Sequence, residues 1–200
     1  MRSMPSLETG RLIIRPFAPD DLNGTFRLFD IEVWKTAAGP GDAAALEARR
    51  AWLQWSALNH QELAKLGQPP YGDRAIILKQ SRELIGSVGY VPYLDVFGQL
   101  PYFRARGLAP DRASTELGLF WAIAPAHQRR GYATEAAGAM IKYAFEEMRL
   151  GRIIATTDYN NVASMGVMRK LDMHIQRNPQ PEPPWLQVVG VLEAGAHGKE

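Results

Sequence analysis

The sequence predicts a mixed α/β fold, in which helices pack on a sheet. Two observations lead to this prediction. Short apolar runs rich in β-branched and aromatic residues recur along the 200-residue chain, and each has the length of a strand. Between several of them lie stretches with the apolar spacing of a helix, one of which covers residues 42–66 without glycine or proline.

The N-terminal half begins with a strand that Pro16 closes. Pro19 and the two aspartates after it indicate the start of a helix, because proline suits the first helical turn and carboxylates suit the positive end of the helix dipole. Residues 80–82 separate two apolar runs and are typical of a hairpin turn. The elements predicted here are a strand over 12–17, a helix from residue 19, a long helix over 42–66 and strands over 74–79 and 83–90.

The long helix needs an apolar face to pack on the sheet. Leu46, Leu53 and Ala57 lie at helical spacing. Trp52 and Trp55 are expected to widen this face, and the alternative role for one of them is to line a substrate groove.

The C-terminal half predicts alternating strands and helices after a long irregular segment. Residues 91–112 are rich in proline, glycine and aromatic residues without a clear period, and such a segment inside a domain is usually functional or mobile. Asn161 suits the N-cap of a short helix. We find neither a repeat nor a linker, so we expect one domain over 1–200 with a frayed tail from about residue 195. The elements predicted here are strands over 115–123, 152–157 and 185–192 and helices over 133–148 and 163–171.

Composition excludes several classes of protein. The chain has no cysteine, which excludes disulfides, thiolate catalysis and cysteine-ligated metals. His60, His174 and His197 are scattered without metal-ligand spacing, and His127 is expected to be a solvated loop residue. The net charge of +2 does not favour a nucleic-acid surface, and the sequence has neither a secretory signal nor a spanning apolar run. We therefore expect a cytoplasmic protein that binds no metal, nucleic acid or membrane.

One short stretch, QRRGYA over residues 128–133, predicts an anion site. It lies between a strand and a helix, where unpaired backbone N–H groups and the helix dipole create partial positive charge. Gly131 lets the backbone approach a bulky anion, small Ala133 leaves room, and two neighbouring arginines add donors for phosphate oxygens. Pyrophosphate would fit such a site. The alternative is an ordinary loop, and both the dinucleotide fingerprint and the Gly-Lys-Ser/Thr phosphate loop are absent.

The QRRGYA motif is part of a longer stretch, and two further stretches of the chain accompany it. LETGRLIIRPFAPDDL near the N-terminus, ELGLFWAIAPAHQRRGYATEA in the middle and NNVASMGVMRKLDM near the end follow in this order. Together they resemble the GCN5-related N-acetyltransferase (GNAT) superfamily, in its ribosomal-protein-alanine acetyltransferase (RimJ/RimL-like) branch, from about Leu7 to Leu192. The resemblance implies a mostly antiparallel central sheet with a splayed parallel strand pair and about four flanking helices. It also implies acetyl-CoA as co-substrate.

The resemblance further implies which residues bind the cofactor. The strand end at Trp121, Ala122 and Ile123 would pair its backbone with the amides of the pantetheine arm, because unpaired strand groups need partners. Asn161 and Ser164 would face the pantetheine end. The residues implied to surround the pyrophosphate are Gln128, Arg129, Arg130, Gly131, Tyr132, Ala133 and Thr134.

Acetyl transfer to an amine needs a proton acceptor and an oxyanion donor. Glu116, at the start of the central strand, is the first candidate for the base; the alternative is a surface carboxylate at a strand end, and Asp158 is a weaker choice. The backbone N–H of Ile123 is the candidate oxyanion donor. Glu135, in the first helical turn, is expected to be structural, because it would repel a pyrophosphate that it faced.

The position expected to protonate the leaving thiolate departs from the family pattern. Many relatives have a tyrosine in the helix after the asparagine, where this chain has Met168. Water, Ser164 or Tyr159 are the alternatives. Asp172 stands where glycine is common, and aspartate tolerates a left-handed helix cap.

The expected acceptor is a primary amine: a protein N-terminus by resemblance, or a small molecule such as an amino acid or aminoglycoside. Residues 91–112 are expected to form either a wall of the acceptor site or a subunit interface, and their arginines weakly favour an acidic acceptor. Direct transfer in a ternary complex is expected, because the chain has no recognised nucleophile pair. A homodimer is a family-level expectation. Two other functions stay open, namely a non-catalytic acyl-CoA-binding module and a nucleotide-binding regulator.

Overall fold

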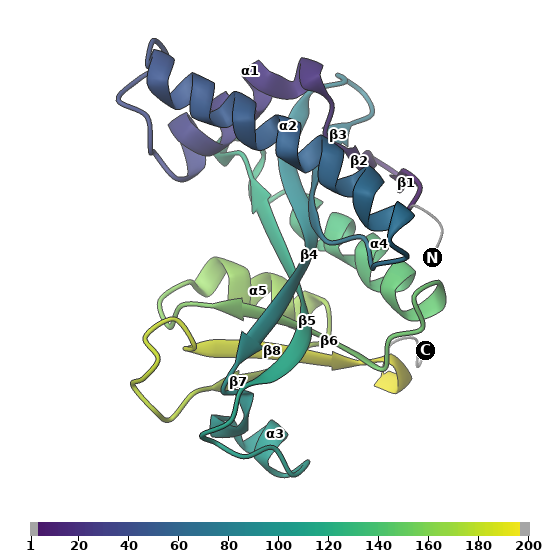
Figure 1. Cartoon of the computed structure of the whole chain (residues 1–200), viewed down its shortest axis with the longest axis vertical. Helices are drawn as coiled ribbons and strands as arrows, with labels where there is room; N and C mark the ends of the chain where they lie inside the picture. Colours follow the sequence, from purple (N-terminus) through teal and green to yellow (C-terminus); the bar gives the residue numbers. More distant parts are fainter. Residues whose placement is uncertain (1–3, 197–200) are drawn as a thin grey trace. The chain divides into compact units, whose positions relative to one another are not determined.

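The computed structural model describes residues 4–196, and contacts divide the chain into two compact units (Figure 1). The first unit comprises the residues up to Tyr90 together with Trp121–Ala139. The second comprises Val91–Phe120 and the residues from Met140 onward. Each unit is therefore assembled from separate pieces of chain. No helix among the described residues is long and apolar enough to cross a membrane.

Hydrogen bonding orders the strands β1-β2-β3-β4-β5-β6-β8-β7. The pairs β1–β2, β2–β3, β3–β4, β6–β8 and β7–β8 are antiparallel, whereas β5 and β6 are parallel. The predicted mixed sheet with a parallel pair is thus confirmed. The strands are β1 (Leu7–Glu8), β2 (Leu12–Pro16), β3 (Gly72–Leu78), β4 (Leu84–Asp95), β5 (Ser114–Ile123), β6 (Arg152–Thr157), β7 (His174–Arg177) and β8 (Val188–Glu193).

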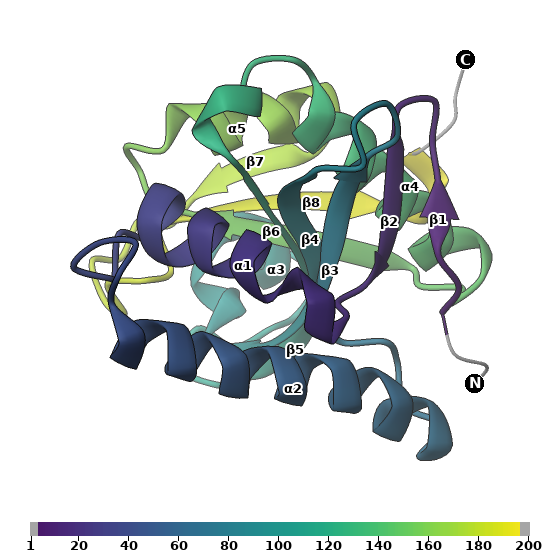
Figure 2. The same cartoon turned by 90° about the horizontal axis from the view of Figure 1, so that it is seen from above.

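The helices of the first unit lie between β2 and β3 in sequence. The helix predicted from residue 19 is present but irregular, since a 3-10 turn (Pro19–Asp21), α1 (Leu22–Thr25) and a π-helical stretch (Phe26–Val33) follow one another. The long helix α2 (Ala43–Lys65) matches its predicted range, and α1 and α2 lie side by side in Figures 1 and 2.

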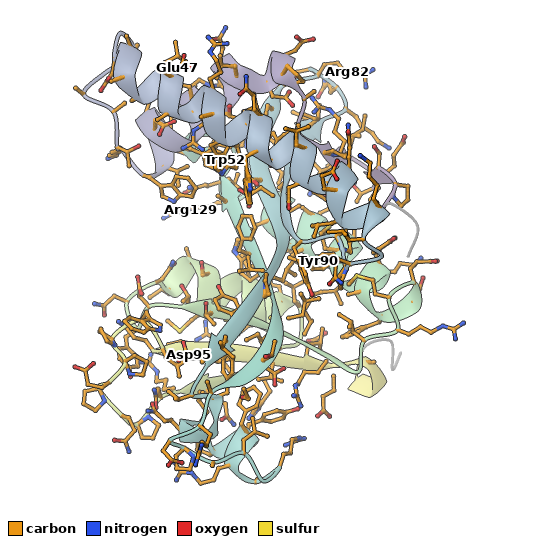
Figure 3. The ribbon with its side chains drawn as sticks, viewed as in Figure 1. Glu47, Trp52, Arg82, Tyr90, Asp95 and Arg129 are labelled. Carbon is orange, nitrogen blue, oxygen red and sulfur yellow. The ribbon has the colours of Figure 1, made fainter. Side chains whose placement is uncertain are left out.

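The buried face of α2 differs from the predicted one. Leu53 is buried, and Trp52, labelled in Figure 3, packs against the same apolar cluster. Trp55 is 58% exposed, so its predicted packing was wrong. The inner face carries two polar residues as well, and one of them, Arg49, forms an ion pair of 2.7 Å with buried Asp30. The buried members of the cluster are Phe17, Leu28, Phe29, Leu53, Ala75, Ile77, Leu84 and Ala124.

The second unit gives regular structure to part of the segment predicted to be a loop. Strand β4 continues to Asp95, because its last residues alternate between half-buried and exposed side chains. A short helix α3 (Pro101–Arg104) follows, and its Phe103 is fully buried. One buried apolar cluster of this unit comprises Phe97, Leu100, Phe103, Ile154, Leu186, Val189 and Val191.

Two strands near the C-terminus differ from the prediction. Strand β7 was missed because its four residues include a single apolar one, Ile175, and so form no apolar run. Strand β8 begins at Val188 rather than at Trp185, whose exposed indole donates to Asp95 at 2.9 Å. Strand β6 has the predicted bounds.

Two helices complete the fold. Helix α4 (Tyr132–Glu146) follows β5, and α5 (Val162–Lys170) follows β6. Asn161 caps α5 as predicted, since its side-chain oxygen accepts from Ser164 N at 3.0 Å. Asp172 has a left-handed backbone with φ of 57°, as expected for the end of this helix. Of the predicted frayed tail, residues 197–200 lie outside the described residues.

Candidate functional site

The loop between β5 and α4 in the first unit has the backbone of an anion site. Arg129 and Gly131 adopt left-handed angles, with φ of 60° and 82°. Left-handed residues beside ordinary ones turn neighbouring N–H groups to one side, which creates an anion-binding concavity. The first N–H groups of α4 follow at once from Tyr132 and have no helical partner. Exposed Arg129, labelled in Figure 3, and exposed Arg130 add positive charge.

The loop is fixed to the strand before it. The side-chain amide of Gln128 donates to Ile123 O at 2.9 Å. Ala124 N donates to Ile85 O at 2.9 Å, which holds the end of β5 against β4. Any side chain at position 86 would clash with Ala122 O, so Gly86 allows this close approach. The predicted residues Trp121, Ala122 and Ile123 thus lie on a rigid strand end, of which Ile123 is buried.

An arginine that had no predicted role supports the loop from the other side. Arg11, in the turn between β1 and β2, donates through Nη1 to Arg130 O at 3.0 Å and through Nε to Glu135 at 2.6 Å. Its guanidinium lies 4.5 Å from the centre of the Tyr132 ring. Arg11 therefore contacts the loop and the first turn of α4 together.

Glu135 is structural, as the sequence indicated. Besides Arg11, it accepts from the Thr9 hydroxyl at 2.6 Å and from Arg11 N at 2.9 Å. Burial raises the pKa of Glu135, but the bonds from Thr9 and Arg11 outweigh burial and hold the pKa below its usual value. The carboxylate thus stays charged and ties the N-terminal strands to α4.

His127 is not the solvated residue that we expected. Its side chain is only 13% exposed, and Nε2 lies 3.3 Å from Glu83. Its Nδ1 is buried and has no hydrogen-bond partner among the described residues. The ring packs near Tyr132, with 6.3 Å between ring centres, so His127 contributes to packing at the base of the loop.

In the second unit, Glu116 forms a buried ion pair. It is 6% exposed, and Arg152 Nε donates to one carboxylate oxygen at 2.8 Å while Nη2 donates to the other. The bond from Glu116 raises the pKa of Arg152, although burial opposes this. The alternative of a solvated carboxylate at a strand end is therefore wrong. Arg152 also lies 5.2 Å from the centre of the Phe103 ring.

The second unit also contains the predicted pantetheine-facing residues. Asn161 is exposed and Ser164 is half-buried at the start of α5. Tyr159, an alternative proton donor, has its hydroxyl bonded to Asn178 O at 2.7 Å. Met168 is fully buried and packs against Gly190. The parallel strands β5 and β6 pair at one registered position, Gly118 with Ile154, which is consistent with early separation of the two strands.

Sequence reasoning missed a second carboxyl group, Asp73 on β3. Burial raises the pKa of Asp73 to about 6, against the attraction of Arg49 and the nearby Ser87 hydroxyl, which lower it. The Ser87 oxygen is buried and has no hydrogen bond of normal geometry among the described residues. Asp73 lies on β3 but directly before the strand predicted over 74–79, and it belongs to no motif, so no sequence signal identified it.

The structure thus brings together some of the predicted residues. In the first unit, the end of β5, the anion loop and the first turn of α4 are continuous and share hydrogen bonds. Glu116, Asn161 and Ser164 belong to the second unit. Among the described residues, no group of three or more histidine, aspartate or glutamate side chains could hold a metal ion.

A hollow of about 710 Å³ also lies in the second unit. It is bordered by the segment after β4, through Gln99, Arg104 and Asp111, and by the loop before β8, through Gln180 and Glu182. Arg104 is held by Gly98 O and Gln99 O, at 3.2 and 3.1 Å. The hollow is therefore lined by side chains of both charges, and hydrogen bonds fix the position of Arg104 among them.

One family matches most of the chain. Residues 11–174 match the family described as "Acetyltransferase (GNAT) domain". The Bacillus subtilis (strain 168) protein named "Uncharacterized N-acetyltransferase YnaD" is 38% identical over 106 residues, which are 51% of this chain and 52% of that protein. The chain thus matches about half the length of this relative.

Solved structures share the fold. An acetyltransferase from Agrobacterium tumefaciens str. C58 superposes with a TM-score of 0.64 at 24% identity, over 96% of both chains. RimL, a ribosomal L7/L12 α-N-protein acetyltransferase solved with coenzyme A, has a TM-score of 0.62 at 13% identity, over 94% of this chain and 97% of that one. Ribosomal-protein acetyltransferases are therefore among the structural neighbours, consistent with the RimJ/RimL-like resemblance.

Proposed function

The chain belongs to the GNAT acetyltransferase family, and we propose that it transfers acetyl from acetyl-CoA to a primary amine by direct attack within a ternary complex. Family membership supports an acetyl-CoA-dependent N-acetyltransferase. The observation that carries the proposal furthest is the loop before α4, whose left-handed Arg129 and Gly131 suit a bulky anion. Coenzyme A has such an anion in its pyrophosphate.

The proposed cofactor residues fit the chemistry of coenzyme A. Backbone N–H groups and two exposed arginines in the loop are donors for phosphate oxygens. The strand end and the start of α5 offer polar groups for the amides of the pantetheine arm. The residues that we propose to contact the cofactor are Trp121, Ala122, Ile123, Gln128, Arg129, Arg130, Gly131, Tyr132, Ala133, Thr134, Asn161 and Ser164. Bound acetyl-CoA supplies an activated thioester.

Groups of the chain itself would stabilise the developing charge and transfer protons. We propose that Ile123 N–H stabilises the developing oxyanion and that Ser164 assists the leaving thiolate. Glu116 stays the sequence-predicted base. Both of its carboxylate oxygens accept hydrogen bonds from Arg152.

The acceptor that we propose is a protein N-terminus or a small-molecule amine. RimL, a structural neighbour, is named for its action on a ribosomal protein, which supports the peptide class. The hollow beside Gln99 and Arg104 is where we expect the predicted acceptor wall. A homodimer and a cytoplasmic location stay predictions.

One assay tests the function. Free-thiol release from acetyl-CoA is measured with N-terminal peptides, amino acids, polyamines and aminoglycosides, and release with one class is expected. The competing function is an acyl-CoA-binding module, which the engaged Glu116 and buried Met168 favour. Thermal stabilisation by acetyl-CoA without release would support that module; at about 100 times its Kd, a ligand adds roughly 2.7 kcal/mol. Stabilisation by ATP alone would favour a nucleotide-binding regulator.

The double variant Arg130→Ala/Gly131→Val tests the anion loop. We expect acetyl-CoA binding to weaken by at least about tenfold, because a cation is lost and a side chain is forced into a left-handed backbone that costs roughly 1–2 kcal/mol. Calorimetric titration measures Kd. Gly107→Val is the matched control, since Gly107 has φ of 87° with open space around it. Unchanged affinity in the double variant would remove the loop from the site.

A further inference from the structure

Asp73 and Ser87 lie together on the face of the first unit that α2 covers. Asp73 on β3 pairs with Gly89 on β4, and Ala75 pairs with Ser87. Directly paired residues point to the same face, and so do residues two apart along a strand. Ala75 belongs to the apolar cluster that includes Leu53 of α2. The side chains of Asp73 and Ser87 therefore face α2 as well.

The same stretch of β4 lies beside the end of β5. Ala124 N donates to Ile85 O, and Gly86 faces Ala122 O at a distance that admits no side chain. Ala122 also packs against the cluster that contains Ala75. Ser87 is thus next to the strand end whose Ile123 N–H is the proposed oxyanion donor.

The surroundings of Asp73 leave its carboxyl free to exchange a proton. It forms no ion pair with any described residue and keeps an intermediate exposure. The nearest opposing charge, Arg49, is committed to Asp30 through two bonds of 2.7 and 3.0 Å. The buried Ser87 hydroxyl has no hydrogen bond of normal geometry within the described part of the chain, although it lies near enough to lower the pKa of Asp73.

We propose that Asp73 accepts the proton of the attacking amine, with Ser87 beside it as an orienting hydroxyl. The amine nitrogen forms a bond to the acetyl carbon, its N–H proton passes to an Asp73 oxygen directly or through one water, and the C–S bond breaks. Coenzyme A leaves with the electron pair of that bond, and Asp73 later releases its proton to solvent. This inference rests on the proposed acetyl transfer, and it assigns the proton to a carboxyl that forms no ion pair with a described arginine.

The electrostatics suit this role. Burial raises the pKa of Asp73 to about 6, so that the group is mostly ionised at neutral pH yet far more basic than an ordinary aspartate. The charged groups facing it are Arg49 with Asp30 from the α2 side, and Arg15 with its partner Asp21 from β2. Strand β4 contributes uncharged Ser87, and residues 121–124 of β5 carry no titratable side chain.

The first test is the pH profile of Asp73→Asn in the full-length protein. Between pH 5 and 9, wild-type kcat/KM for the acceptor found above is expected to rise with an apparent pKa near 6. The variant should lose at least about 100-fold in kcat and lose this rise, while acetyl-CoA Kd is unchanged. Asp20→Asn, an exposed aspartate in the first unit, is the matched control.

Two further variants keep the test decisive if Asp73→Asn folds poorly. Asp73→Glu restores a carboxyl and should restore the rise in rate. Ser87→Ala removes a hydroxyl that lowers the pKa of Asp73, so the rise should move to higher pH. The proposal would be overturned if Asp73→Asn kept the full rate and the wild-type pH profile. It would also be overturned if Glu116→Gln lost the rise in rate with pH while Asp73→Asn kept it. Absence of thiol release by the wild type would instead contradict the proposed function.

Discussion

Two carboxyl groups, one in each unit, are both enclosed by protein but have opposite surroundings. Glu116 on β5 has both oxygens bonded to Arg152. Asp73 on β3 forms no ion pair with any residue in the range 4–196, and the arginine that attracts it is bound to Asp30. A bidentate arginine fixes a buried carboxylate in position. Without such a partner, burial favours the protonated form.

Position in the sequence and surroundings in the fold favour different carboxyl groups as the base. Glu116 was the natural candidate from sequence because it begins the central strand, but its partner lies 36 residues away on β6. A proton acceptor needs a basic, accessible lone pair, and tertiary contacts decide which carboxyl has one. The following predictions concern variants in which these carboxyl groups, or their partners, are changed.

The largest expected effect on stability comes from removing the cation of the buried pair. Arg152→Met should lower the free energy of unfolding by about 3 kcal/mol at pH 7, because Glu116 stays buried without compensation. Urea unfolding at pH 7 measures this change. Arg50→Met, in an exposed pair with Glu47, should change stability by about 0.5 kcal/mol or less.

Asp73→Asn should change the free energy of unfolding in the opposite direction. The folded-state pKa of about 6 lies above the reference value of 3.8, so the folded protein binds protons more tightly and loses stability as pH rises between these values. Above pH 7 the asparagine variant should therefore be more stable by on the order of 2 kcal/mol, with little difference at pH 4. Equal pH dependence in both proteins would contradict the raised pKa. A gain in stability with a loss of turnover would mark a site kept for function.

The smallest expected effect is on the affinity for acetyl-CoA, and it concerns Glu135. Like Glu116, Glu135 has an arginine partner, but its side chain is more exposed. Arg11→Ala removes the bonds to Glu135 and to Arg130 O and should weaken acetyl-CoA binding about fivefold, since the anion loop loses a support. Calorimetric titration measures Kd, and Arg50→Ala is the surface control. A change in Tm without a change in Kd would mean that Arg11 serves folding alone.

Much of the fold follows from local sequence. The long helix, the hairpin over β3 and β4, strand β6 and the Asn161 cap were all predicted, because each rests on spacing or on neighbours within a few residues. The errors have a common cause. Strand β7 has too few apolar residues to form a run, and Trp55 was assigned to the core by its type although the opposite face of α2 carries it.

The sequence by itself determined the family and most of the order of the elements, and it predicted an anion site before α4, because these depend on composition and short-range pattern. Only the tertiary structure decided which carboxylates are paired. Thr9 and Arg11 reach Glu135 across more than 120 residues, and Arg152 reaches Glu116 across 36. Such pairings depend on strand register and on burial, which set both the distance between charges and the cost of keeping them charged.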